Sequence, residues 1–198
     1  MSNQPPASPH ANTKTRILET AWTLVNERGI GVGVGEIAAA AGVSRQLVYV
    51  HFTSRAGLLV AMARHQDARS GFRERALATR ELPPAQALDR LVRAWCEYLP
   101  EILPVALGLE AALIAGEEGA AAWRDRMGEL HQAFRFATGK LAEAGALAPD
   151  WSPERAADWA WAQVQPSSWL HLVTERGWSE EEYVSHATAT ISGRLANV

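Results

Sequence analysis

Side chains that could hold a nucleic acid recur at helical spacing in one short segment of the chain. Arginine, glutamine, tyrosine and histidine can donate to base edges or phosphates, and short apolar groups can contact the thymine methyl. Winding the segment at about 100° per residue places Gln46, Leu47 and Val50 on one side. Val48 and Phe52 fall on the opposite side, where they can be buried. The residues of this candidate surface are Ser44, Arg45, Gln46, Leu47, Tyr49, Val50, His51 and Arg55.

The residues around this segment predict two short helices that cross at a tight corner. Gly42 can end the first helix in a left-handed conformation, and Ser44 can cap the second by accepting a bond from its free amides. Ala38 is small enough for the helices to cross closely. The pattern predicts a helix-turn-helix with a recognition helix. The alternative, an ordinary helical hairpin, would leave Leu47 and Tyr49 exposed without a purpose.

Further motifs surround this corner in the sequence. They are Arg16–Ala21, Asn26–Gly29, Glu36–Ala38, Ala41–Ser44, and the residues Tyr49, His51, Phe52, Ser54, Arg55 and Leu58. Together they resemble the DNA-binding domain of the TetR family of one-component transcriptional repressors. The resemblance implies a repressor that leaves a palindromic operator on double-stranded DNA when a small apolar or aromatic effector binds. Two recognition helices in successive major grooves require a homodimer, because one head contacts too few phosphates.

The chain departs from the family pattern at three positions. Gly33 stands where the family usually caps the second helix with Ser or Thr, so a side-chain phosphate contact is lost there. Gln46 replaces a small residue, and Arg55 replaces a common lysine with a different phosphate geometry. We expect these changes to alter which operator is read rather than whether DNA is bound.

The charge is divided unevenly along the chain. Residues 1–80 hold ten Lys and Arg against five Asp and Glu, whereas residues 81–198 hold nine against seventeen. A basic first part on an acidic remainder is typical of a DNA-binding head attached to a body that does not touch DNA. The chain has 198 residues, and its 47% hydrophobic content is enough for a substantial core.

The same composition argues against a membrane protein and against a secreted one. No uninterrupted apolar run approaches the roughly 18 residues of a membrane span, because Glu110 interrupts the longest stretch. Residues 1–12 are polar and proline-containing, so they predict a flexible tail rather than a signal peptide. The single Cys96 excludes an internal disulfide and suits a reducing cytoplasm. We therefore expect a cytoplasmic protein with no membrane partner.

Residues for catalysis or metal binding are not grouped in the sequence. The six histidines are scattered, and none has a second ligand at a metal-binding spacing on a shared helix face. Cys96 lies in an apolar helical pattern and is better explained as a core residue than as a nucleophile. We expect no metal site, no cofactor and no enzyme activity.

Apolar periodicity and the positions of Gly and Pro predict an all-α fold of about nine helices. The helices are expected at residues 12–28, 36–41, 45–52, 55–80, 85–99, 105–115, 119–144, 152–177 and 179–195. Pro166 is expected to bend or split the helix that contains it. Ser179, with Glu182 three residues later, is expected to form a capping box at the start of the last helix. The predicted organisation is a three-helix head at residues 1–53, with the tail at 1–12, and a ligand-binding and dimerisation body at residues 54–198.

Tryptophan is concentrated in the body, with seven of the eight beyond residue 81. These side chains are either core and interface anchors or the walls of a cavity for a flat or apolar ligand. An acidic residue in an apolar helix would either pair with a ligand cation or face solvent. The candidate cavity residues, which lie on the helices that enclose the effector in the family, are Trp95, Glu110, Trp123, His131 and Phe134.

The last two helices carry more large apolar residues than one body needs inside, so we expect them to form a four-helix dimer interface. The residues assigned to this interface are Trp169, Leu170, Val173, Tyr183, Ala187, Ile191 and Leu195. The alternative function is a helical ligand-binding protein that keeps the head as a fold without operator binding. Such a protein would show no salt-sensitive affinity for DNA.

Overall fold

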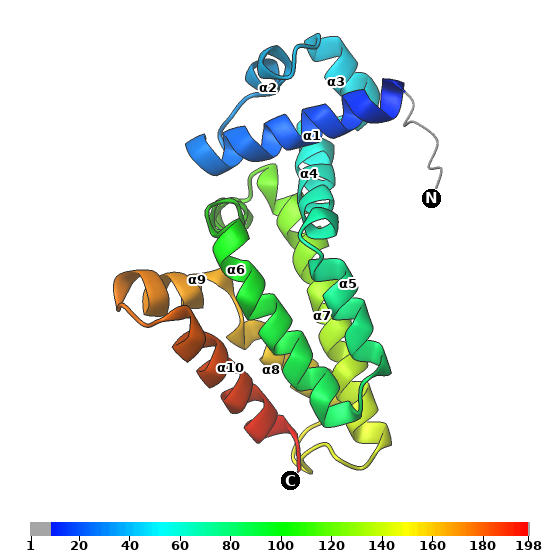
Figure 1. Cartoon of the computed structure of the whole chain (residues 1–198), viewed down its shortest axis with the longest axis vertical. Helices are drawn as coiled ribbons and strands as arrows, with labels where there is room; N and C mark the ends of the chain where they lie inside the picture. The colour runs from blue at the N-terminus through cyan, green and yellow to red at the C-terminus, as the bar shows by residue number, and fades with distance from the viewer. Residues whose placement is uncertain (1–8, 198) are drawn as a thin grey trace, which may run out of the picture.

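The computed structural model describes residues 9–197, which form ten α-helices and no β-strand (Figure 1). The predicted all-α class is confirmed, with ten helices in place of about nine. The α-helices are α1 (Pro9–Arg28), α2 (Val34–Ala40), α3 (Arg45–Phe52), α4 (Arg55–Arg69), α5 (Phe72–Ala78), α6 (Pro84–Ala115), α7 (Gly119–Glu143), α8 (Pro153–Gln163), α9 (Pro166–Trp169) and α10 (Glu180–Leu195). Two short turns join them, the 3₁₀ turn η1 (Thr79–Glu81) and the π-helical turn η2 (Leu170–Glu175).

The first helix begins before its predicted start. The sequence placed a flexible tail at residues 1–12, of which residues 1–8 lie outside the described part. Pro9 opens α1, three residues before the predicted start of this helix at residue 12. Proline is favoured in a first turn because its fixed φ suits a helix and its missing N–H has no partner to lose.

Helices α1, α2 and α3 form the head, with α1 lying across the top of α4 (Figure 1). Buried apolar side chains join them, among them Ile17, Ala21 and Val25 from α1 and Ile37 from α2. Arg16 Nε also donates to the carbonyl oxygen of Ala41 at 3.0 Å, and so ties α1 to the end of α2. The head is held by its own apolar core and by this long-range bond.

The single helix predicted over residues 55–80 is divided in the structure. Gly71, at φ +69°, lies between α4 and α5 in a conformation that favours glycine. The hydroxyl of Ser70 accepts from the amide of Phe72 at 3.2 Å and donates to the carbonyl of Asp67 at 3.1 Å. The prediction was wrong because one glycine within a helical pattern is compatible with either outcome.

The opposite error occurs in α6. Pro100 and Pro104 were expected to separate two helices, but both lie inside one continuous helix. Proline inside a helix removes a backbone bond and produces a kink. In Figure 1, the amino-terminal part of α6 runs along the body, whereas the part after the prolines is seen nearly end-on. The helix is therefore continuous but bent.

Its length changes one expectation about membranes. By length and composition alone, α6 is the one helix among residues 9–197 that is long and apolar enough to cross a bilayer. Glu110 does not exclude such a segment, because the mean hydropathy of α6 stays high despite this charge. A core helix of a soluble protein passes the same test, and α6 packs against α5, α7 and α10.

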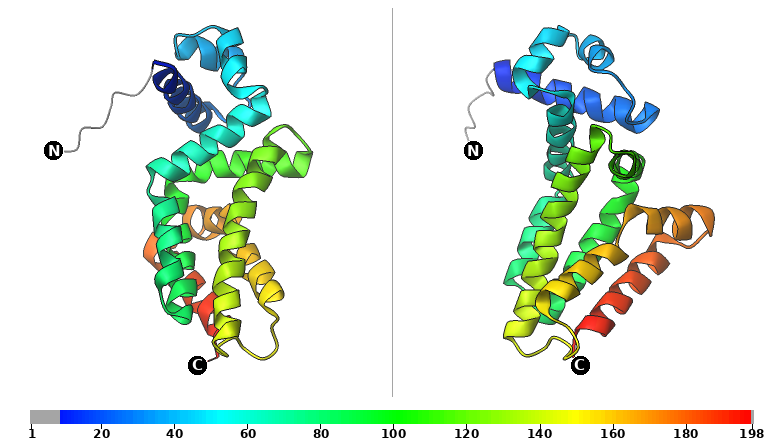
Figure 2. Two further views of the ribbon diagram at one scale, coloured as in Figure 1. Left: turned by 90° about the vertical axis from the view of Figure 1, so that its right-hand side faces the viewer. Right: turned by 180° about the vertical axis from the view of Figure 1, so that it is seen from behind.

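The body is built around α6 and α7, with α8 on α7 and α10 on α6 (Figure 2). The helix predicted over residues 152–177 is split before Pro166, as expected, into α8, α9 and the turn η2. The last helix starts with the predicted capping box, in which Ser179 and Glu182 exchange bonds of 3.1 and 2.7 Å.

The head meets the body through a close contact at the start of α7. A β-carbon added to Gly119 would lie 2.7 Å from both Cβ of Ala112 and Cδ1 of Ile30, the latter from the link between α1 and α2. Gly108 also faces Ile30, with 3.3 Å between the added and existing β-carbons. Only glycine at position 119 allows this approach of head and body.

This contact predicts opposite effects for two glycines of α7. Gly119→Ala should lower the free energy of unfolding by roughly 1–3 kcal/mol, because the added methyl group overpacks the joint. Gly128→Ala, in the same helix and with no atom within 4 Å of the added carbon, should raise it by roughly 0.5–1 kcal/mol. Urea denaturation measures both. Equal effects at the two positions would contradict the close packing at Gly119.

Candidate nucleic-acid interface and ligand cavities

The corner between α2 and α3 has the predicted local geometry. Gly42 is left-handed at φ +65°, and the amide of Val43 donates to the carbonyl of Ala38 at 3.0 Å. The hydroxyl of Ser44 caps α3 by accepting from the amide of Leu47 at 3.1 Å. These bonds satisfy the free groups at the two helix ends and fix the angle at which α3 leaves the corner.

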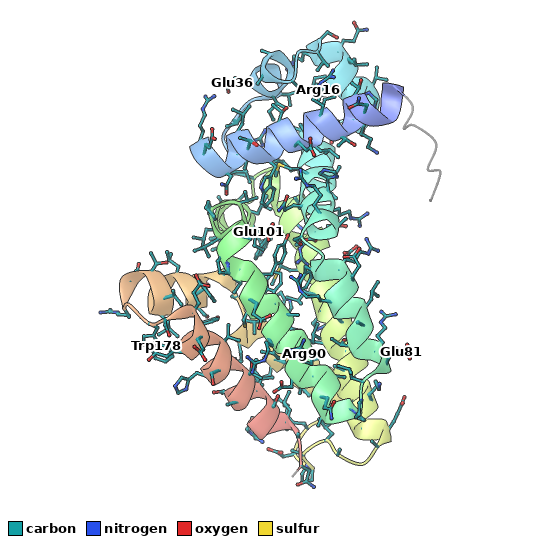
Figure 3. All side chains as sticks on the ribbon, in the orientation of Figure 1. Arg16, Glu36, Glu81, Arg90, Glu101 and Trp178 are labelled. Carbon is teal, nitrogen blue, oxygen red and sulfur yellow. The ribbon has the colours of Figure 1, made fainter. Side chains whose placement is uncertain are left out.

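The start of α2 is stabilised by the side chain of Glu36, because its N-cap, Gly33, has no side chain. The carboxylate of Glu36 accepts from the amide of Gly33 at 2.9 Å and also pairs with Arg28. The bond from Gly33, followed by the bond from Arg28, lowers the pKa of Glu36. Both Glu36 and Arg16 lie on the head in Figure 3. Glu36 thus satisfies the amide of Gly33, whereas the bond that a Ser or Thr side chain would accept at this N-cap is absent.

The outer face of α3 is open to solvent. Val48 and Phe52 are buried in the head as predicted, whereas Tyr49 and Val50 are 36% and 71% exposed. Arg45 and Gln46 are exposed as well. Val50 is therefore an apolar side chain held in water with no protein contact to explain it.

Two of the exposed donors on α3 are ordered by each other. The guanidinium of Arg45 lies over the ring of Tyr49, 5.6 Å from its centroid, and Nη2 is 3.4 Å from the hydroxyl. Stacking limits the rotamers of both side chains before any ligand arrives, so less entropy is lost on binding. Lys14 of α1 adds a second cation beside this helix, 5.8 Å from the ring centroid of Phe52. Helical periodicity did not predict Lys14 here, because its place beside α3 follows from packing.

Two other predicted residues are less free. Leu47 and His51 are only partly exposed, and Nε2 of His51 is buried without a hydrogen-bond partner among the described residues. A contact from His51 to DNA therefore stays a prediction that would require the ring to turn outward.

Arg55 has a different position from the one that a phosphate contact needs. Its Nη2 donates to the carbonyl of Ile30 and lies 3.5 Å from that of Val32, and its Nη1 lies 3.3 Å from a carboxylate oxygen of Glu118. The side chain is only 22% exposed. This position corrects the expectation that Arg55 contacts a phosphate. The guanidinium instead joins α4 to the link between α1 and α2 and to the start of α7.

The five predicted cavity residues do not surround one space. Trp95 and Phe134 are fully buried in the core, and the indole of Trp95 donates to the carbonyl of Val164 at 2.8 Å. Glu110 lies 3.3 Å from the hydroxyl of Ser167, and partial burial is the main cause that raises its pKa. Trp95 and Phe134 are thus core residues in this structure, and Glu110 has a partner inside the protein.

The two remaining residues line a shallow groove between α7 and α8. Trp123 and His131 form its wall with Met127 and Trp161, around a volume of about 390 Å³. His131 is bound to Asp158 at 2.8 Å and meets the edge of the Trp161 ring. Part of the predicted set therefore does share a concave, mostly apolar surface.

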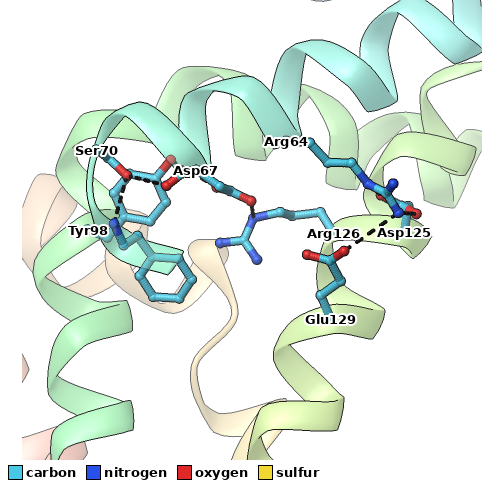
Figure 4. Close-up of polar contacts among 8 residues, drawn as sticks. Arg64, Asp67, Ser70, Tyr98, Asp125, Arg126 and Glu129 are labelled. Carbon is cyan, nitrogen blue, oxygen red and sulfur yellow. Dashed lines mark hydrogen bonds and ion pairs between the residues drawn. The ribbon is translucent and has the colours of Figure 1, made fainter. Parts of the chain in front are cut away.

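A second cavity, of about 240 Å³, lies between α4, α5 and α7. Asp67 of α4 and Arg126 of α7 form a buried ion pair in its wall, with 2.7 Å between Oδ2 and Nε (Figure 4). The hydroxyl of Tyr98 donates to Asp67 at 3.0 Å. Burial is the main cause that raises the pKa of Asp67, against the lowering effect of Arg126. No sequence pattern predicts this pair, because its members come from separate helices.

The predicted dimer residues divide into two groups. Trp169, Tyr183, Ile191 and Leu195 are buried within the chain itself, and the first two have ring centroids 4.8 Å apart. They serve the core of the protomer, which corrects their assignment to an interface. The residues that stay partly exposed are Leu170, Val173 and Ala187.

Metal-binding side chains are not grouped in the described part of the chain, and its cysteine is not exposed. Residues 9–197 contain no group of three His, Cys, Asp or Glu side chains that could hold a metal ion. Cys96 is fully buried, and burial raises the pKa of its thiol to about 12. A thiol in this state is almost entirely protonated at neutral pH and reacts slowly.

A capped corner, an exposed second helix and an all-α body define a helix-turn-helix DNA-binding protein. Residues 17–62 match the family model described as bacterial regulatory proteins of the tetR family. No curated protein matches the chain.

Solved structures share the fold over nearly the whole chain. A structure from Rhodococcus sp., assigned to the TetR-family transcriptional regulators, is 24% identical, with a TM-score of 0.71 over 92% of this chain and 98% of that one. A transcriptional regulator from Saccharomonospora viridis, solved with choline, is 21% identical, with a TM-score of 0.73 over 94% and 99%. The fatty acid degradation regulator FadR from Bacillus halodurans is 16% identical, with a TM-score of 0.72 over 97% of each chain.

The match at residues 17–62 identifies the head as similar to the DNA-binding part of tetR-family regulators, and it supports a DNA-binding transcriptional regulator. The head carries the family match, and the body shares the fold of these regulators at low sequence identity.

Proposed function

We propose that the protein is a cytoplasmic repressor that binds a palindromic operator as a homodimer and leaves it when a small molecule binds the body. The observation that carries the proposal is the outer face of α3, where Arg45, Gln46, Tyr49 and Val50 are exposed on a helix fixed by caps at its corner. We divide the chain into a DNA-binding head at residues 1–53 and a ligand-binding and dimerisation body at residues 54–198.

Each exposed group has a chemical role in this proposal. The amide of Gln46 can bond adenine with two hydrogen bonds in the major groove, and Val50 can contact a thymine methyl. Arg45 and Tyr49 reach phosphates, which position the helix without reading sequence. Because such contacts release counterions, the affinity should fall steeply with salt. The alternative, a ligand-binding protein whose head does not bind an operator, would show no such salt dependence.

The body supports an effector of small size. The groove beside Trp123 and His131 and the cavity beside Asp67 and Arg126 are both concave and partly apolar. The relative from Saccharomonospora viridis was solved with choline, which supports a small-molecule site in this fold. An effector in the body touches no DNA, so it acts by favouring a conformation in which the two heads are wrongly spaced.

Gln46→Ala tests the assignment of the outer face. The change should cost roughly 1–3 kcal/mol at one operator position and relax the base preference there, because the adenine loses two bonds. Tyr49→Phe, which removes one phosphate-reaching hydroxyl, should instead weaken binding to all DNA sequences about equally. Selection of bound DNA from a random pool, repeated for each variant, measures both. An unchanged base preference with Gln46→Ala would place the groove-reading face elsewhere.

A further inference from the structure

The cavity between α4, α5 and α7 has a charged wall that its protein neighbours do not fully satisfy. Arg126 is only 5% exposed, so its guanidinium depends on the protein for its hydrogen bonds. Nε is bound to Asp67, but Nη2 is buried with no hydrogen-bond partner among the described residues. In Figure 4 the two terminal nitrogens of Arg126 point away from Asp67. A buried donor without a partner is costly, and an anion would relieve that cost.

The aromatic faces nearby already hold a cation. The guanidinium carbon of Arg126 lies 4.9 Å from the ring centroid of Phe72 and 4.7 Å from that of Trp95. These rings are the surfaces on which a quaternary ammonium group would otherwise rest. With Arg126 in that place, a cationic ligand would find the rings covered and meet a like charge.

The remaining charges at the cavity are not balanced. Arg64 is neutralised by Asp125 at 2.6 Å and by Glu129 at 3.6 Å. Arg73 and Arg80 are exposed lining residues at the same cavity, and neither has an acidic partner within 4.0 Å in the described part of the chain. The cavity therefore combines a buried guanidinium with two uncompensated cations, which attract an anion.

Apart from Glu129, which pairs with Arg64, and Gln132, the rest of the lining is apolar. Phe72, Ala76, Leu77, Leu130 and Ala133 form it, on α5 and α7. The volume of about 240 Å³ is below the roughly 300–1,000 Å³ of sites for drug-sized ligands. The space suits a small molecule with one charged end and a short apolar or aromatic body.

We propose that this cavity binds a small organic acid, whose carboxylate accepts from Arg126 and whose apolar body lies against Leu77, Leu130 and Ala133. The inference rests on the proposed function in one respect, that the acid is the effector of the regulator. Arg126 lies on α7 and its partner Asp67 on α4, the helix that leads from the head into the body. A carboxylate that competes with Asp67 for Arg126 weakens the link between these helices.

The test compares acids with their neutral isosteres. Benzoate and octanoate, with benzamide, octanamide and choline, are titrated into the full-length protein by calorimetry. Tryptophan emission, to which Trp95 beside Arg126 contributes, is recorded in parallel. At least one acid should bind roughly 10–100-fold more tightly than its amide, the range of a charge-assisted hydrogen bond. Choline should show no measurable binding at this site. Acids that bind no better than their amides overturn the proposal.

Variants separate a binding role from a structural one. Arg126→Gln should remove the preference for the acid, but it also leaves Asp67 unpaired and could unfold the body. Arg73→Ala and Arg80→Ala alter exposed side chains. Each should therefore weaken binding of the acid several-fold and leave the melting temperature unchanged. Arg135→Ala, which alters an exposed arginine of α7 outside both cavities, is the matched control and should have no effect. Equal effects of the changes at Arg135, Arg73 and Arg80 would mean that net charge alone attracts the acid, and would overturn the site.

A separate measurement keeps the two proposals distinguishable. DNA selected from the random pool is titrated with and without a saturating acid. If the acid binds and lowers DNA affinity, DNA must lower the affinity for the acid by the same factor. Binding of the acid with unchanged DNA affinity overturns its role as effector. A protein that binds the acid but no DNA sequence contradicts the proposed function and leaves the anion site standing.

Discussion

Asp67→Ala is expected to lower the free energy of unfolding by about 3–5 kcal/mol, because it leaves the guanidinium of Arg126 buried without its acid. Asp67 and Arg126 are both nearly inaccessible, and Tyr98 would lose the acceptor of its hydroxyl as well. Urea denaturation, followed by circular dichroism, measures the loss. A loss below about 1 kcal/mol would mean that water or a rotated side chain satisfies Arg126.

The matched control removes both charges. Asp67→Leu combined with Arg126→Met should recover much of the loss, because an apolar pair of similar volume avoids the cost of desolvating two ions. A double variant as unstable as Asp67→Ala would show that shape rather than charge determines the effect.

The same carboxyl gives a pH signature. Burial raises the pKa of Asp67 above its ordinary value of 3.8, so the folded state holds the proton more tightly than the unfolded chain. Between the ordinary and the raised pKa the folded state binds more protons, and stability from this group therefore falls as the pH rises. The measurement is the free energy of unfolding as a function of pH. Subtracting the values for Asp67→Asn from those for the wild type isolates this slope.

Leu170→Glu is expected to give monomers and to reduce operator affinity by about 10³-fold or more, toward the level of non-specific binding. Two heads joined by symmetry are needed to engage both half-sites, and a charge at a partly exposed apolar position of η2 would be desolvated in the proposed interface. Light scattering reports the oligomeric state, and DNA titration the affinity.

Two comparisons sharpen this experiment. Ile114→Glu adds the same charge at an apolar residue that is 84% exposed at the end of α6, and should leave the dimer intact. Ile191→Glu is unsuitable, because Ile191 is fully buried within the protomer and the charge would damage its core. If Leu170→Glu remains dimeric with normal helical content, the interface lies elsewhere.

Features set by nearby residues could be predicted from the sequence. The left-handed Gly42, the Ser44 cap and the Ser179–Glu182 capping box each depend on fewer than five consecutive positions, and all were confirmed. Helical periodicity also predicted that Val48 and Phe52 are buried on the side of α3 opposite its outer face. Local geometry was sufficient for these helix ends and for the two sides of α3.

Features that depend on which helices meet could not be predicted in this way. Arg55 has the expected charge for a phosphate, but the approach of Ile30 and Glu118 turns it inward. The pair of Asp67 and Arg126 joins residues that neither periodicity nor motif connects. Surplus apolar residues in the last helices gave no indication of whether they were buried against their own chain or a partner.

The two prolines of α6 give this helix a distinctive exchange behaviour. Pro100 supplies no N–H to the carbonyl of Cys96, and Pro104 supplies none to that of Pro100, so adjacent turns lack these bonds. The turns before Pro100 are anchored by Trp95, whereas those after Pro104 carry Gly108 against Ile30 of the head. Amide hydrogen exchange should therefore resolve α6 into two protected blocks with separate opening free energies. The block after Pro104 can follow the head while the block before Pro100 stays closed, so α6 combines a fixed half and a compliant half in one helix.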